Sequence, residues 1–181
     1  SSAASDVYKR QSAYQALENA GKVVPSALLF VNSIASQYLT PDELSEYSAR
    51  YASILPRIVI EITEEECLDP KALRIKQTIR GSSGAFALDD YGSGYSNGNS
   101  LLTVAPKYVK VDIAIIQGID TDADKQQFLM TLIDYAHPRG VQVLAEGVET
   151  LSELRKVLEM GVDLLQGYRL APPAAEPGAC L

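Results

Sequence analysis

The stretch FALDDYGSGYS, residues 86–96, joins an apolar run to two adjacent carboxylates and then to a loop with two glycines. The charges of Asp89 and Asp90 repel each other, so their adjacency at the end of a strand requires a compensating partner. Successive side chains of a regular strand point to opposite faces, so both aspartates can reach one site only where the backbone turns. Gly92 and Gly94 permit such a turn, because glycine tolerates left-handed conformations.

Five other apolar runs resemble this one, and segments with helical periodicity separate them. Each run is short, rich in β-branched, leucine or aromatic residues, and bounded by turn or polar residues, as is typical of strands. The six runs cover residues 27–32, 57–63, 85–90, 108–112, 141–147 and 162–167. Strands that alternate with helices predict an α/β fold with a parallel sheet. This pattern alone is compatible both with an open doubly wound sheet and with most of a barrel.

The helical segments carry recognisable start and stop signals. The tetrapeptides at 40–43 and 150–153 have the capping-box pattern, and Gly161 is placed to end the second helix. Two sets of apolar residues follow helical spacing: Phe128, Leu129, Leu132, Ile133 and Ala136, and Leu151, Leu154, Val157 and Leu158. Such spacing predicts two helices that each bury one face.

Composition limits the classes of function. The chain has 181 residues, 46% hydrophobic and 22% charged, which is typical of one globular domain. Its formal net charge of −7 repels nucleic-acid polymers and membrane surfaces, so an anionic ligand would need a bound cation. The widely separated Cys67 and Cys180 indicate no disulfide scaffold and a reducing, cytoplasmic compartment. The single histidine, His137, excludes a histidine-rich metal site. No apolar run reaches transmembrane length, and we expect no membrane contact by this segment.

Polar residues recur where the predicted strands end. They are Asn32, Glu61, Asp89, Asp90, Lys110, Asp112, Glu146 and Gln166. The carboxyl ends of parallel strands meet at one side of a sheet, where α/β folds place their sites. Crowded carboxylates either stay protonated or bind a cation, and oxygen ligands favour Mg²⁺, Mn²⁺ or Ca²⁺. An aspartate pair can bridge two ions, and two neighbouring ions are suited to displacement at phosphorus.

Several of these residues also have an ordinary structural explanation. An aspartate at a strand end, such as Asp112, commonly caps a helix or forms a turn. On this explanation residues 64–66 are a solvated acidic run and Lys107 is a surface charge. Gln166 is then a hydrogen-bonded polar residue near a turn. The recurrence of polar residues at six successive strand ends nevertheless favours a shared site.

The ordered motifs resemble those of the EAL-domain family, the bacterial phosphodiesterases of cyclic di-GMP. The motifs are EITE (61–64), DDYGSGYS (89–96), VKVD (109–112), AEGVE (145–149) and QGY (166–168), with FVNSIAS (30–36) similar to the family's asparagine-bearing strand. The similarity runs from about residue 27 to residue 173. It implies a modified TIM (β/α)₈ barrel and metal-dependent hydrolysis of cyclic di-GMP to linear pGpG.

The resemblance also implies roles for individual residues. The implied ligands of two Mg²⁺ or Mn²⁺ ions are Asn32, Glu61, Asp89 and Asp90. The implied catalytic residues are Glu146 and Lys110. Substrate-binding or supporting roles fall to Asp112, Gln166 and Glu149. Glu64 is implied to anchor the loop that contains Gly92 and Gly94. Tyr91 and Ser93 stand where the family often has phenylalanine and threonine.

One departure from the family is large, because the name-giving Glu-Ala-Leu motif is not found before Asn32. Residues 16–18 read Ala-Leu-Glu in a helical setting, so their order is wrong. The six predicted strands match the family's last six of eight, and the first two would lie upstream of Ser12. Residues 6–11, DVYKRQ, are similar to a translated transposon end used in sequencing libraries. We therefore expect a non-native or adaptor-like segment at 1–11, an incomplete EAL-type domain at 12–173 and a tail at 174–181.

Three functions remain to be distinguished. The intact parent is expected to be a phosphodiesterase, whereas this chain by itself is expected to be inactive. A catalytically inactive domain that senses cyclic di-GMP is the alternative, and an enolase-like proton abstractor with Lys110 as base is the third. The resemblance further implies a homodimer and an upstream sensor or GGDEF-type domain.

Overall fold

The computed structural model describes residues 28–32, 55–63, 84–94 and 99–173, and the single positions 42, 45, 49, 52, 53, 73 and 77. Four predictions lie outside these residues: the adaptor-like segment at 1–11, the helix start at Thr40, the anchoring role of Glu64 and the tail at 174–181. Residues 16–18 lie outside them as well.

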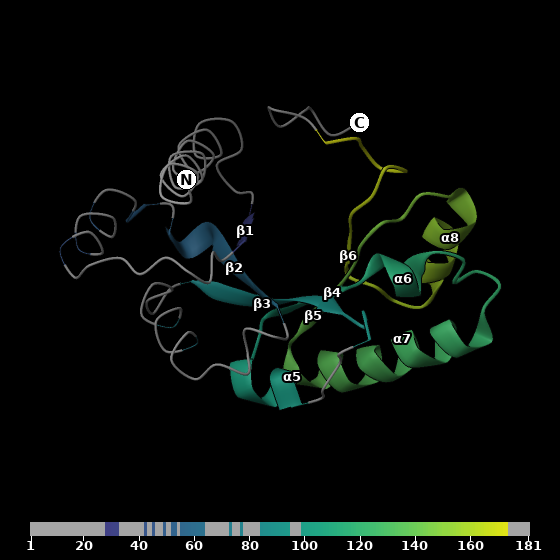
Figure 1. Ribbon diagram of the computed structural model, residues 1–181, viewed down its shortest axis with the longest axis horizontal. Helices are drawn as coiled ribbons and strands as arrows, with labels where there is room; N and C mark the ends of the chain where they lie inside the picture. Colours follow the sequence, from purple (N-terminus) through teal and green to yellow (C-terminus); the bar gives the residue numbers. More distant parts are fainter. Residues whose placement is uncertain are drawn as a thin grey trace, which may run out of the picture.

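Six parallel strands form a curled half-barrel (Figure 1). The strands are β1 (Leu29–Asn32), β2 (Ile58–Thr63), β3 (Ala85–Tyr91), β4 (Tyr108–Val111), β5 (Gln142–Ala145) and β6 (Leu164–Leu165). Each coincides with one of the runs predicted from sequence. Their order in the sheet is their order in the chain, without a reversal. In a doubly wound sheet the order of the strands reverses at a switch point. The sequential order found here therefore favours the barrel over the open sheet.

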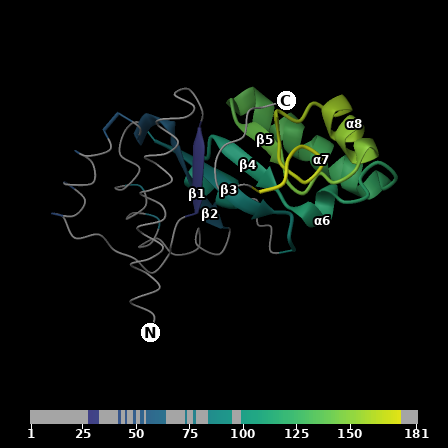
Figure 2. The same ribbon diagram turned by 90° about the horizontal axis from the view of Figure 1, so that it is seen from above.

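Helices follow the strands and cover the convex side of the sheet. They are α5 (Asn99–Val104), α6 (Ile113–Ile116), α7 (Ala123–Ala136) and α8 (Leu151–Glu159), with 3₁₀ turns η1 (Leu55–Arg57) and η2 (His137–Arg139). Figures 1 and 2 show α7 and α8 packed on the β4–β5 side of the sheet. Within the described ranges, no helix is long and apolar enough to cross a bilayer.

Both helices predicted from apolar spacing are confirmed. Helix α7 buries Leu129, Leu132, Ile133 and Ala136 against the sheet. Helix α8 begins at Thr150, whose hydroxyl accepts from the Glu153 N–H while the Glu153 carboxylate accepts from the Thr150 N–H. This reciprocal pair is the predicted capping box. Gly161, with φ +89°, follows the last turn.

The two faces of the sheet form separate apolar layers because side chains alternate along each strand. Residues of one parity pack outward against the helices, among them Ile62, Leu88, Val109, Val111 and Val143. Residues of the other parity pack together on the concave face: Phe30, Val59, Ala87, Tyr108 and Leu164. The rings of Phe30 and Tyr108 lie 5.2 Å apart, edge to face. Glu61, Asp89 and Lys110 share the inward parity, so they project from the concave face.

A β-bulge in β3 brings the two aspartates to the same side. Leu88 pairs with Val109 and Tyr91 with Val111, so two residues of β3 face one residue of β4. Asp90 itself has a left-handed backbone, with φ +54°. The turn predicted at Gly92 and Gly94 follows directly, with the Ser93 N–H donating to the Asp90 carbonyl at 3.2 Å. After the bulge Tyr91 faces outward and packs against the ring of Phe128 in α7, with ring centroids 6.1 Å apart.

The loop after β5 passes very close to α6 at Gly147. A Cβ atom there would lie 2.2 Å from Ile113 Cγ1, and the backbone is left-handed, with φ +68°. Any other residue would therefore encounter both a backbone strain and a collision with the Ile113 side chain.

We predict that Gly147→Ala lowers the free energy of unfolding by about 2–4 kcal/mol, because the strain and the overpacking add. Gly140→Ala is the matched control, since Gly140 has φ +69° but no atom within 4 Å of its Cβ position. The control should lose only about 1 kcal/mol. Urea denaturation of both variants measures the difference, and equal losses would show that contact with Ile113 has no effect on stability.

Candidate active site

Lys110 lies at the centre of the concave face, surrounded by carboxylates from three strand ends. It extends from β4 and is 6% exposed. Its Nζ lies 2.6 Å from Glu61 Oε1, 2.7 Å from Asp89 Oδ1 and 2.9 Å from Glu146 Oε1. Burial by itself lowers the pKa of Lys110, but hydrogen bonds to the three carboxylates outweigh it and raise the pKa above its ordinary value. Lys110 is therefore a permanent cation at neutral pH.

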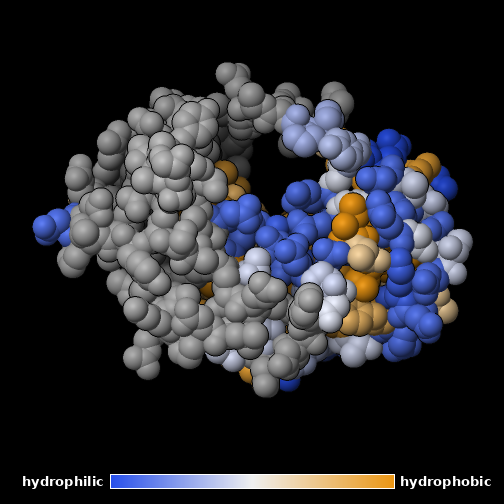
Figure 3. Space-filling view, viewed as in Figure 1, coloured by the Kyte–Doolittle hydropathy of each residue, from blue (hydrophilic) through white to orange (hydrophobic). Residues whose placement is uncertain are grey.

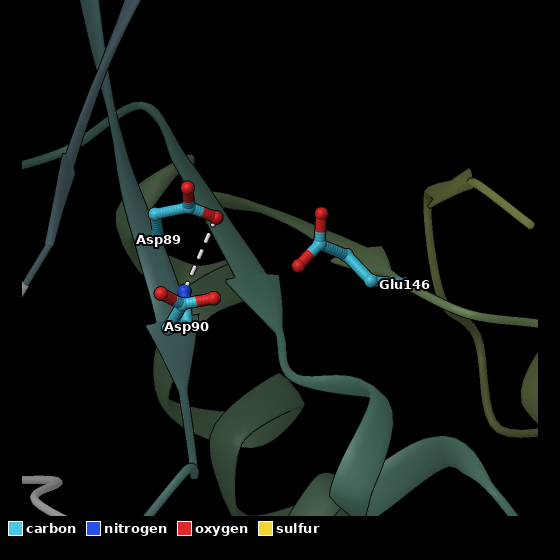
Figure 4. Close-up of side chains that lie close together, drawn as sticks. All are labelled: Asp89, Asp90 and Glu146. Carbon is cyan, nitrogen blue, oxygen red and sulfur yellow. Dashed lines mark hydrogen bonds between the residues drawn. The ribbon is translucent and has the colours of Figure 1, made fainter. Parts of the chain in front are cut away.

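A second cluster lies beside the lysine and consists of Asp89, Asp90 and Glu146. Each residue offers a carboxylate oxygen within 4.8 Å of the others. Figure 4 shows the aspartates on β3 and Glu146 facing them from the loop after β5. The Asp90 N–H donates to Asp89 Oδ1 at 3.1 Å, which keeps the two carboxylates adjacent.

The electrostatics of this cluster show an excess of negative charge. The pKa of Asp90 is raised by burial first and then by the charges of Asp89 and Asp112, against an opposing effect of Lys110. The pKa of Glu146 is also raised, because burial outweighs its hydrogen bond to Lys110. One lysine thus leaves part of the negative charge uncompensated. An all-oxygen donor set of this kind fits a hard divalent cation.

Asp112 combines its ordinary structural role with an influence on the site. Its carboxylate accepts from the Ala114 N–H at 2.8 Å and caps α6. Its charge also contributes to the raised pKa of Asp90. The supporting role predicted from the resemblance therefore has a physical basis in charge rather than in a direct contact with the cluster.

The remaining predicted residues are more exposed than the cluster around Lys110. Asn32 is exposed at the end of β1, in register with Glu61. Gln166 is exposed. Its backbone N–H donates to the Ala145 carbonyl, and its carbonyl accepts from the Val148 N–H. Glu149 is exposed too, and Figure 3 shows hydrophilic residues gathered across the middle of this view. Gly92 and Gly94 form the turn that follows Asp90, with φ +101° and +112°.

Sequence reasoning missed the part played by Glu153. Its carboxylate is 5% exposed and accepts from the backbone of Gly118, Glu149 and Thr150. Burial raises its pKa, but these hydrogen bonds outweigh the effect and lower the pKa overall. The capping box predicted the contact with Thr150. The contact with Gly118, 35 residues away, has no local signal in the sequence.

We predict that Lys110→Met lowers the free energy of unfolding by about 3–5 kcal/mol, because three partly buried carboxylates lose their shared cation. Lys107→Met is the matched control, since Lys107 precedes the same strand but is exposed. Its replacement should change stability by less than about 0.5 kcal/mol. Chemical denaturation at neutral pH in EDTA compares the two; a similar small loss in both would contradict the central position of Lys110.

Asp90→Asn should slightly stabilise the cation-free protein at neutral pH. Because the pKa of Asp90 is raised on folding, its ionised form destabilises the fold above that pKa. This penalty disappears as the pH falls below the ordinary value of 3.8. The denaturation midpoint in EDTA should therefore exceed wild type at pH 7 and converge with it near pH 3.5. Asp134→Asn, on the exposed face of α7, should show no such pH-dependent gain.

A family model, related sequences and solved structures all indicate the same family for this chain. The EAL domain family model matches residues 9–173. The chain is 30% identical over 119 residues to the cyclic di-GMP phosphodiesterase PdeL of Escherichia coli, which covers 65% of this chain and 33% of PdeL. It is 29% identical over 135 residues to the cyclic di-GMP phosphodiesterase PdeF of the same organism, covering 74% of this chain and 18% of PdeF. The chain thus spans a third or less of the length of these relatives.

Solved structures match over almost all of the chain. A manganese and cy-diGMP complex of Klebsiella pneumoniae BlrP1 superposes with a TM-score of 0.81 at 27% identity, covering 92% of this chain and 44% of that one. A c-di-GMP-bound standalone EAL protein from Vibrio cholerae superposes with a TM-score of 0.77 at 28% identity, covering 93% and 73%. With the motifs in order at the carboxyl ends of a curled parallel sheet, the chain belongs to the EAL-domain family.

Proposed function

We propose that this chain carries most of the active site of a cyclic di-GMP phosphodiesterase, which hydrolyses one phosphodiester bond to give linear pGpG. The observation that carries the proposal is the cluster of Asp89, Asp90 and Glu146 beside the buried Lys110. Negative charge in excess of one lysine attracts divalent cations, and these in turn attract a doubly anionic dinucleotide.

The acidic residues fit a two-cation site. Asn32, Glu61, Asp89 and Asp90 would hold two Mg²⁺ or Mn²⁺ ions. When bound, the ions would supply charge neutralisation at the phosphate and a water of lowered pKa. Glu146 would orient the attacking water and accept its proton, consistent with a carboxylate pKa raised by burial. As the new oxygen–phosphorus bond forms, the opposite phosphorus–oxygen bond breaks, and the departing ribose oxygen takes up a proton from solvent to become a hydroxyl group of pGpG.

Lys110 would stabilise charge rather than transfer a proton. Its ammonium group is fixed by three carboxylates and its pKa is raised. The positive charge of a protonated lysine can stabilise negative charge that develops on a nearby phosphate. It cannot abstract a proton from carbon at neutral pH, which disfavours the enolase-like alternative.

The relatives support this assignment at the level of the family. PdeL and PdeF are named as cyclic di-GMP phosphodiesterases, and the structures of BlrP1 include complexes with manganese or calcium and cy-diGMP. Because the chain spans only part of these proteins, the activity of the whole protein is part of the proposal. Homodimerisation, an upstream sensor or GGDEF-type domain and a cytoplasmic location also stay predictions.

A sensor that binds cyclic di-GMP without hydrolysing it is the second candidate. It would bind the same ligand at the same acidic cluster, so binding alone does not separate it from the enzyme. The expected inactivity of the chain by itself also stays a prediction. The two functions differ in one measurable result, the formation of pGpG by the natural gene product.

We predict that Asp89→Asn in the natural gene product reduces pGpG formation at least about 100-fold, because Asp89 both pairs with Lys110 and joins the acidic cluster. Product is measured by chromatography with Mn²⁺ and cyclic di-GMP. Asp134→Asn should leave the rate within about twofold of wild type. Binding of cyclic di-GMP by wild type without pGpG formation would reject the enzyme and select the sensor.

A further inference from the structure

Glu153 is a buried carboxylate whose contacts connect two separate loops. It lies in the first turn of α8, is 5% exposed and forms no salt bridge within the described part of the chain. Its Oε2 accepts from the N–H groups of Glu149 at 3.1 Å and Thr150 at 2.9 Å. Its Oε1 accepts from the Gly118 N–H at 2.9 Å. Burying a carboxylate is costly unless hydrogen bonds compensate its charge. Here both oxygens of Glu153 accept from backbone N–H groups, and the side chain has to reach two loops to do so.

The loop that Glu153 contacts carries Glu146. At the start of this loop the Glu146 N–H donates to the Val111 carbonyl at 3.1 Å. In its middle the Val148 N–H donates to the Gln166 carbonyl at 3.0 Å. At its end the N–H groups of Glu149 and Thr150 are held by Glu153. Glu153 is thus the side chain that closes the far end of the loop.

The second contact of Glu153 fixes α6 to the same loop. Gly118 follows directly on α6, and Ile113 at the start of α6 fills the space over Gly147. Helix α6 therefore touches the loop at Gly147 through Ile113, and is tied to its far end through Gly118 and Glu153. The cap of α6, Asp112, in turn lies near enough to Asp90 for its charge to raise the pKa of that residue.

We propose that Glu153 is a positioning residue that fixes Glu146 against Asp89, Asp90 and Lys110 by clamping the β5–α8 loop to the end of α6. The inference rests on the proposed function only for its kinetic consequence. The clamp depends on the reach of the side chain, because one carboxylate spans two loops. It also depends on two acceptor oxygens, since all the direct partners are backbone N–H groups.

Variants that break the contact with one loop test the proposal. Glu153→Asp keeps both acceptor oxygens but is one methylene shorter, so it cannot serve both loops. Glu153→Gln keeps the reach and an acceptor oxygen for Glu149 and Thr150, but its amide nitrogen cannot accept from the Gly118 N–H. Thr150→Ala is the matched control, because it removes the other half of the same capping box while its backbone N–H still donates to Glu153. The measurements, on the natural gene product, are Mn²⁺ affinity by calorimetry and kcat and KM for cyclic di-GMP, at a temperature where all variants are folded.

We expect Glu153→Asp to weaken Mn²⁺ binding about tenfold and to lower kcat at least about tenfold with KM within threefold of wild type. Glu153→Gln should lose about as much as Glu153→Asp, because it gives up the contact with Gly118, whereas Thr150→Ala should stay within about threefold of wild type in all three quantities. Wild-type values for Glu153→Asp, or equal losses in Glu153→Asp and Thr150→Ala, would overturn the proposal. If wild type forms no pGpG, the proposed function fails separately, and the Mn²⁺ affinities alone decide the role of Glu153.

Discussion

The buried ammonium group of Lys110 is the interaction on which the concave face depends. Three carboxylates from different strand ends approach it within 2.9 Å or less. Without a cation at their centre, these acids would repel one another and recruit protons instead. The lysine thus allows a parallel sheet to gather several acids at one edge. The remaining negative charge on Asp90 and Glu146 is what the site offers to a ligand.

The alternation of side chains along the strands produces most of this arrangement. Inward parity places Glu61, Asp89 and Lys110 on the concave face, above the small apolar layer of Phe30, Val59, Ala87, Tyr108 and Leu164. That layer separates the charges from the interior below them. The outward-facing residues form the larger core with the helices. Alternate residues of the same strands therefore stabilise the fold and line the concave face.

The elements that local pattern determines could be predicted from the sequence. The six strands and the helices at 123–136 and 151–159 follow from alternation, helical spacing and capping residues. The polar strand ends predicted a shared site because parallel strands end on one side. Local pattern left the sheet order open, and only the family resemblance implied the barrel. The left-handed Asp90 and the contact between Glu153 and Gly118 could not be predicted, because each depends on pairing between segments distant in the chain.

The bulge in β3 gives this edge of the sheet its second inward carboxylate. Its extra residue turns Asp90 inward beside Asp89 and, in the same step, turns Tyr91 outward to Phe128. The concave site and the convex helix layer therefore share a two-residue stretch of backbone. Deletion of one aspartate would restore regular alternation and leave Tyr91 facing outward, but it would remove one of the two inward carboxylates. The extra residue of β3 therefore adds a second acid to the concave face without disturbing the helix layer on the other side.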